Sequence, residues 1–127
     1  MIAGVGMDLC GVERMREACE SEAFCRRVFT EAELSYAAGK KSRACHLAAA
    51  YAAKEAFAKA TGLGLAKLGL HSVSVRHDAE GRPFLVLDPQ TPALEPYRRA
   101  RFHLSLSHDG GIAAAVVIYE TEGVCWP

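Results

Sequence analysis

The sequence contains no long apolar run, no excess of charge of either sign and no Cys-x-x-Cys pair. A membrane-spanning helix needs about 20 consecutive apolar residues, so we expect no membrane span. The 15 Lys and Arg residues balance the 15 Asp and Glu residues, which argues against a nucleic-acid binder that relies on a positive field. The N-terminus lacks the basic start of a secretory signal, and Asp8 interrupts it too early for an apolar signal core.

The cysteines are odd in number and scattered: Cys10, Cys19, Cys25, Cys45 and Cys125. A disulfide framework would favour an even set, and a zinc site would need clustered ligands. The pattern therefore predicts reduced thiols in a cytoplasmic protein.

The length of 127 residues, half of them apolar, fits one domain over residues 1–127, with 119–127 as the last strand end and a tail. No repeat, linker or low-complexity stretch divides it. The start at Met1 and the absence of a linker favour a free-standing protein.

Several helices are predicted from capping and spacing. Residues 12–19 repeat at helical spacing, and Thr30-Glu31-Ala32-Glu33 is a capping-box sequence whose helix Gly39 would end. The alanine-rich segment 46–60 is the strongest helix, with Gly62 as its stop. A short helix is expected after Thr91-Pro92.

Strand patterns dominate the second half, although one strand is expected at the N-terminus. The predicted strands are residues 2–7, 72–76, 83–87, 102–107 and 112–119. This order predicts an α+β fold in which an N-terminal strand and helices pack on a mainly antiparallel sheet.

Two acidic side chains and a lysine are candidate catalytic groups. Asp8, at the expected strand-to-helix junction, is either a functional loop residue or a helix N-cap. Glu55 and Lys59 are four residues apart on one helix face, which fits a surface ion pair worth about 0.3–0.5 kcal/mol. If Asp8 and Glu55 meet, they could instead bind Mg²⁺ while the lysine neutralises phosphate, as phosphoryl-group chemistry requires.

The segment 103–108 alternates strictly between polar and apolar residues. His103, Ser105 and Ser107 share one strand face, and His108 falls at the turn. These side chains could donate to phosphates or a nucleotide. The alternative is a strand with one solvated face.

Several segments, in this order along the chain, resemble the holo-acyl-carrier-protein synthase family, the small class of phosphopantetheinyl transferases. They are residues 2–8 with Glu13-Arg14 following, 29–34, 52–60, 81–83 and 105–108. The resemblance covers most of the chain and implies the 4′-phosphopantetheinyl transferase fold.

The resemblance implies that the 4′-phosphopantetheine group moves from coenzyme A to a serine of apo-acyl-carrier protein, for fatty-acid biosynthesis, with adenosine 3′,5′-bisphosphate as the second product. Asp8 and Glu55 would bind Mg²⁺, and Mn²⁺ accepts the same ligands. Glu55 would help remove the serine proton. Lys59 would stabilise phosphate charge or protonate the leaving group.

The resemblance also implies binding sites and an assembly. Homotrimers with sites between subunits are expected. The residues expected to hold coenzyme A are Lys54, Gly81, Arg82, Pro83, His103, Ser105, Ser107 and His108. Arg14 matches a basic family position that faces the acidic carrier protein; Arg16, Arg26 and Arg27 either extend that patch or are ordinary solvated surface.

One position departs from the family pattern. Many members have an arginine that helps bind the nucleotide phosphate where this sequence has Ala50. Lys40, Lys41 or Arg43 could supply the missing charge. Two alternatives to the enzyme are an inactive trimeric module that binds coenzyme A or a nucleotide, and a structural trimeric domain of a larger synthase.

Overall fold

A computed structural model describes residues 1–122; Cys125 and the rest of the predicted tail from residue 123 lie outside the described residues. The elements are β1 (Ile2–Gly11), α1 (Val12–Ala18), α2 (Glu22–Val28), α3 (Glu31–Ala38), α4 (Arg43–Thr61), α5 (Leu65–Leu68), β2 (Val73–His77), β3 (Pro83–Leu87), the 3₁₀ helix η1 (Pro92–Tyr97), β4 (Arg101–Asp109) and β5 (Ile112–Glu120). Within the described part, no helix is both long and apolar enough to cross a membrane.

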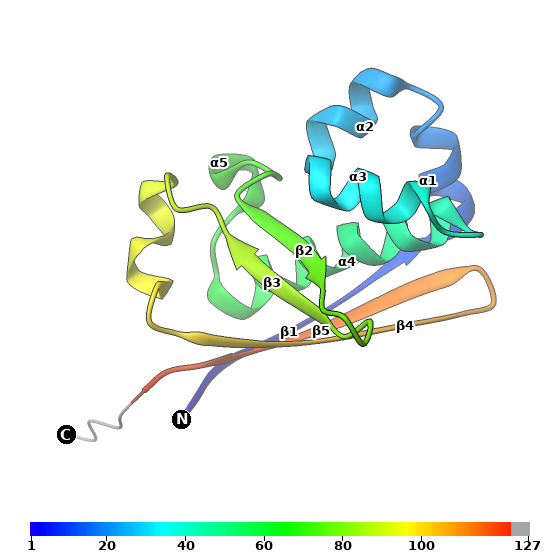
Figure 1. Cartoon of the computed structure of the whole chain (residues 1–127). Helices are drawn as coiled ribbons and strands as arrows, with labels where there is room; N and C mark the ends of the chain where they lie inside the picture. Colours follow the sequence, from blue (N-terminus) through cyan, green and yellow to red (C-terminus); the bar gives the residue numbers. More distant parts are fainter. Residues whose placement is uncertain (123–127) are drawn as a thin grey trace.

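The strands form two antiparallel sheets. The larger has the order β1-β5-β4, and β2 pairs with β3 in the smaller. Figure 1 shows α4 running along the larger sheet, with α1, α2 and α3 grouped beside one end of α4. The predicted α+β fold with a mainly antiparallel sheet is confirmed.

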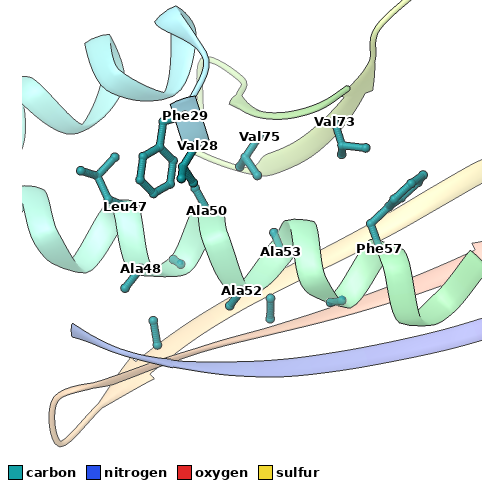
Figure 2. Close-up of a cluster of buried hydrophobic side chains, with 14 of the residues drawn as sticks. Val28, Phe29, Leu47, Ala48, Ala50, Ala52, Ala53, Phe57, Val73 and Val75 are labelled. Atoms are coloured by element: carbon teal, nitrogen blue, oxygen red, sulfur yellow. The ribbon is translucent and has the colours of Figure 1, made fainter. Parts of the chain in front are cut away.

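Helix α4 lies at the centre of the core. Ala48, Ala52, Ala53, Ala56 and Phe57 have no exposed surface. Figure 2 shows the strands of the larger sheet on one side of α4, with Phe29, Val73 and Val75 on the other. A helix covered on two sides needs small side chains around most of its circumference, which explains the alanines.

Two glycines of β1 let α4 approach closely. A Cβ atom on Gly4 would lie 2.0 Å from the carbonyl oxygen of Ala60, and one on Gly6 would lie 1.9 Å from that of Ala56. No side chain fits at these distances. The apolar-glycine alternation of β1 is therefore a packing requirement of the strand–helix contact.

The predicted helix ends are confirmed. Thr30 and Glu33 form both bonds of the capping box at the start of α3, and Gly39 follows its last residue. Gly62 ends α4 with a left-handed φ of 79°, which a side chain rarely adopts.

The end of β1 differs from the prediction. The strand continues past Met7 to Gly11, because β5 offers partners along its whole length, up to the pair Gly11–Ile112. The N-cap of α1 is Gly11. Asp8 therefore lies inside the strand, and both its expected place at the strand-to-helix junction and the N-cap alternative are wrong.

Candidate active site

Asp8 faces α4. Side chains on a strand alternate between its two faces, so Asp8 shares a face with Gly4 and Gly6, which contact α4. Lys59 of α4 donates from Nζ to Asp8 Oδ1 at 3.0 Å and to the Met7 carbonyl oxygen at 3.0 Å. The two candidate groups, remote in sequence, meet because the glycines bring α4 against β1.

Glu55 lies one helical turn before Lys59 and joins the same cluster through Tyr51. The pKa of Tyr51 is raised by burial first, and then by the negative charges of Glu55 and Asp8. Both carboxylates therefore act on one phenol. Among the described residues the acidic partner of Lys59 is Asp8. The predicted surface ion pair between Glu55 and Lys59 is therefore wrong.

The donor set of this cluster fits Mg²⁺. Asp8 has 19% of its side chain exposed and Glu55 is half-buried, so both can reach solvent and a ligand. Mg²⁺ takes one or two carboxylates and completes its octahedron with water and substrate phosphates. Lys59, with 56% of its side chain exposed, places a positive charge beside them.

A cleft of about 450 Å³ gathers most of the residues predicted to hold coenzyme A. Gly81, Arg82 and Pro83 line it from the β2–β3 turn, and β4 contributes Ser105, Ser107 and His108. The polar residues Ser105 and Ser107 are exposed, as their alternation with leucines predicts.

Three aromatic side chains of the cleft were not predicted from the sequence. Tyr36 of α3 stacks on His77 of β2 with ring centroids 3.7 Å apart, and His46 of α4 meets Tyr36 edge-on. They come from separate elements, so no local pattern joined them. The position of His77, shortly before the Gly81-Arg82-Pro83 turn, was the only available signal.

The cleft histidines are held toward their neutral forms. Burial lowers the pKa of His46 and of His77, and the positive charge of nearby Lys40 lowers both further. Nδ1 of His77 is buried without a hydrogen-bond partner among the described residues.

His103 does not join the cleft. Its Nε2 lies 2.8 Å from Glu120 Oε1, across the β4–β5 pair and beyond the residues that line the cleft. Leu104 and Ser105, which follow it on β4, do line the cleft, so a contact of His103 with coenzyme A stays a prediction.

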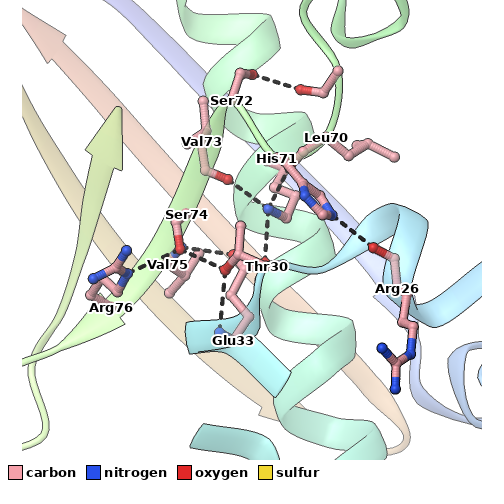
Figure 3. A network of polar contacts seen from close by, with 12 residues as sticks. Arg26, Thr30, Glu33, Leu70, His71, Ser72, Val73, Ser74, Val75 and Arg76 are labelled. Atoms are coloured by element: carbon pink, nitrogen blue, oxygen red, sulfur yellow. Dashed lines mark hydrogen bonds and ion pairs between the residues drawn. The ribbon is translucent and has the colours of Figure 1, made fainter. Parts of the chain in front are cut away.

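The expectation that Lys54 holds coenzyme A is wrong. Its side chain has no exposed surface, and Nζ lies 2.9 Å from Glu33 Oε1. It also donates to the carbonyl oxygens of Leu70 at 2.7 Å and Val73 at 2.6 Å. Figure 3 shows the three residues that this ammonium contacts, Glu33, Leu70 and Val73, within one polar network. Lys54 joins α3, α4 and the chain entering β2.

The position of Ala50 opens a small cavity beside the cleft. Ala50 lines a space of about 20 Å³ together with Glu33, His46 and His77. Lys40 lies near the cleft, with Nζ 4.6 Å from the Tyr36 ring centroid. Arg43 instead donates to Cys25 Sγ at 3.3 Å and lines a different cleft, so it is not a replacement for the missing arginine here.

The arginines predicted to face the carrier protein are all exposed. Arg14 and Arg16 lie on α1, Arg26 and Arg27 on α2. Arg16 pairs with Glu13 and Arg26 with Glu22, each within its own helix. Those acids partly neutralise two of the four positive charges.

Comparisons with known proteins identify relatives over most of the chain. Residues 4–117 match the family profile described as the 4′-phosphopantetheinyl transferase superfamily. A holo-[acyl-carrier-protein] synthase of Treponema denticola is 43% identical over 122 residues, covering 94% of this chain and 99% of the relative.

Solved structures give the same result. The holo-[acyl-carrier-protein] synthase of Neisseria meningitidis has a TM-score of 0.84 at 32% identity, covering 95% of this chain and 100% of that one. That of Bacillus anthracis, in complex with CoA (3′,5′-ADP), has a TM-score of 0.80 at 31% identity, covering 96% and 99%. These likenesses and the meeting of Asp8 with Lys59 lead to one conclusion: the chain belongs to the 4′-phosphopantetheinyl transferase superfamily, among relatives named holo-[acyl-carrier-protein] synthase.

Proposed function

We propose that this protein transfers 4′-phosphopantetheine from coenzyme A to a serine of an apo-acyl-carrier protein, with Mg²⁺ as its cofactor. The observation that carries the proposal is the meeting of Asp8 and Lys59, 3.0 Å apart, one helical turn from Glu55. Relatives with this name, and the related structure with bound CoA, support the activity and the substrate.

The chemistry follows from charge and position. A phosphoryl-type transfer needs alignment and charge neutralisation more than covalent help from the protein. Bound Mg²⁺ would supply Lewis-acid stabilisation of the diphosphate, held by Asp8 and Glu55. Glu55 accepts the proton of the attacking serine hydroxyl. Lys59 offsets the charge that develops on the phosphate or protonates the leaving group.

The cleft is the proposed site for the nucleotide part of coenzyme A. The Gly81-Arg82-Pro83 turn and the hydroxyls of Ser105 and Ser107 provide donors, and His108 lies at its rim. Lys40 is the best-placed replacement for the arginine absent at Ala50, because it reaches Tyr36 at the cleft wall. Lys41 remains a second candidate.

A homotrimer with sites between subunits fits the outer face of the larger sheet. Val5, Met7 and Leu9 point away from α4 and are 61%, 54% and 59% exposed, and Ile112 of the neighbouring strand is 46% exposed. Such a contiguous apolar face is typical of an interface. The cytoplasmic location stays a prediction.

The exposed arginines of α1 and α2 are the proposed docking surface for the acidic carrier protein. Charge complementarity of this kind speeds encounter and weakens with salt. Changing Arg14 to Glu should raise KM for the carrier at low salt and leave KM for coenzyme A unchanged. An Arg76→Glu variant, at an exposed position of β2, is the matched control.

An inactive module that only binds coenzyme A is the second candidate, and Ala50 is the observation that favours it. The intact cluster of Asp8, Glu55 and Lys59 argues against it. One experiment separates the two: incubate the protein with apo-carrier protein, coenzyme A and Mg²⁺, and weigh the carrier by mass spectrometry.

The transferase should add one phosphopantetheine to the carrier. Glu55→Gln should abolish the gain while the circular dichroism spectrum stays that of the parent. Glu31→Gln, at an exposed position of α3, should keep the activity. Absence of any gain with several carriers would leave the binding module as the better description.

A further inference from the structure

A second cleft, of about 510 Å³, shares no lining residue with the one proposed for coenzyme A. Its walls come from α2, α3 and the start of α4, and they include Cys25, Arg26 and Arg43. The proposed transfer reaction uses none of its lining residues except Arg26, in the proposed docking surface.

Cys25, in the wall of this cleft, contacts a second thiol and an arginine. Sγ of Cys25 lies 3.1 Å from Sγ of Cys19, the residue that ends α1. Arg43 donates from Nη2 to Cys25 Sγ at 3.3 Å. A guanidinium in hydrogen-bond contact stabilises a thiolate relative to a thiol, and the thiolate is the reactive form.

We propose that Cys19 and Cys25 are a redox-active dithiol, a modification site that a hydroperoxide oxidises to a reversible disulfide between α1 and α2. The two sulfurs must approach by only about 1 Å to reach the S–S length of about 2.05 Å. The cleft gives a small peroxide access to Cys25, although the residue itself is only 3% exposed.

The step balances in atoms and electrons. The Cys25 thiolate attacks one peroxide oxygen and breaks the O–O bond, giving a sulfenic acid and an alkoxide or hydroxide that takes a proton from water. Cys19 then attacks the Cys25 sulfur, and its own proton leaves with the sulfenic hydroxyl as water. The two sulfurs are oxidised by two electrons, and the peroxide is reduced.

The pKa of Cys19 fits its role in the second step. Burial, and contact with Cys25, raise the pKa of Cys19 to about 12, so Cys19 keeps the proton that the second step needs. The other described thiols lack this arrangement. Burial raises the pKa of Cys10 and of Cys45, and neither has a second sulfur or an arginine donor on its Sγ within residues 1–122.

Peptide mapping of the full chain tests the proposal. The reduced protein is treated with hydrogen peroxide near stoichiometric amounts, alkylated, digested and analysed by mass spectrometry. The expected product is a Cys19–Cys25 linked peptide, lighter by two hydrogen atoms than the reduced pair and restored by dithiothreitol. If both thiols are alkylated as fully as Cys10 and Cys45, or another pair is linked, the proposal is overturned.

Variants assign the roles. Cys19→Ser should stop Cys25 at the sulfenic acid, trapped by dimedone, whereas Cys45→Ser should form the disulfide as the parent does. Arg43→Met should slow oxidation about tenfold, and Lys41→Met should not. Oxidation of Arg43→Met at the parent rate would contradict the activation of Cys25. If a variant does not fold, the mapping of the unmodified protein still decides.

Discussion

Three charged side chains of α4 have three different roles because each helical residue turns by about 100°. Lys54 is enclosed, Glu55 is half-buried near Tyr51, and Lys59 is exposed beside Asp8. The family resemblance implied that all three side chains bind the substrate or the metal. Burial separates the structural lysine from the other two.

The buried pair of Lys54 and Glu33 should dominate local stability. Changing Lys54 to Met should lower the free energy of unfolding by about 3–5 kcal/mol, because Glu33 is then buried without its counter-charge. Urea denaturation measures this change in the free energy of unfolding. Lys67→Met, at an exposed position of α5, should change stability by less than about 0.5 kcal/mol. If Lys54→Met and Lys67→Met change the free energy of unfolding equally, the Lys54–Glu33 pair does not stabilise the fold.

The cleft histidines should make stability depend on pH. Burial lowers the pKa of His46 and His77 below the usual 6.5 in the folded state, with Lys40 and His108 adding positive charge around His46, and Asp78 opposing the shift at His77. Below about pH 6.5 the unfolded chain therefore binds more protons. The free energy of unfolding is therefore retained above that pH and falls as the pH drops toward the lowered pKa values of the two folded-state histidines.

Thermal unfolding between about pH 8 and about pH 5 tests this dependence. A His46→Gln, His77→Gln double variant should lose less stability on acidification than the parent. A Gln90→Ala variant, at an exposed position without an ionisable side chain, serves as the control and should keep the parent's slope. Identical slopes for parent and double variant would rule out this assignment.

At the level of elements, the contact between β1 and α4 positions the catalytic groups. The glycines of β1 remove the side chains that would hold the helix away, and the alanines of α4 do the same from the other side. Asp8 then reaches Lys59 without an intervening residue.

Gly6→Ala should therefore damage stability and activity together. The new Cβ would meet the Ala56 carbonyl oxygen at 1.9 Å and the Ala60 nitrogen at 2.7 Å, so α4 must move. We expect a loss of at least about 1–3 kcal/mol in the free energy of unfolding and a fall in kcat.

Gly64→Ala is the matched control. No atom lies within 4 Å of its added Cβ, and its φ of −81° suits alanine. Its place as the N-cap of α5 slightly favours glycine, so this change should alter the free energy of unfolding by less than about 1 kcal/mol. If Gly6→Ala and Gly64→Ala both unfold at the same urea concentration as the parent, close packing against α4 does not explain why position 6 is a glycine.

At the scale of the whole molecule, the outer face of the larger sheet is an apolar surface that nothing within the described chain covers. Its exposed residues come from β1 and β5, which pair along their whole length, so they form one continuous patch. Covering it with another copy of the chain would remove this area from water.

Met7→Glu should disrupt the proposed trimer, because a carboxylate would be desolvated at the centre of the patch. Light scattering after gel filtration should give a trimer mass for the parent and a monomer mass for the variant. Phe84→Glu, at another exposed apolar residue on β3, should leave the mass unchanged. A monomeric parent at micromolar concentration would argue against the trimer.

Local patterns were enough to predict much of the fold and part of the site. The capping box at Thr30, the stop at Gly62 and the alternation of β4 depend on neighbours in sequence, and each is found as predicted. The resemblance placed Asp8, Glu55 and Lys59 in one site, and the structure brings Asp8 to Lys59, one helical turn from Glu55.

Features that depend on remote partners could not be predicted in this way. Lys54 is buried because Glu33 and two carbonyl oxygens enclose it, and β1 continues to Gly11 because β5 pairs with it. Sequence specifies local conformation through short-range sterics and hydrogen bonds, whereas burial and charge pairing depend on which distant segments the fold brings into contact.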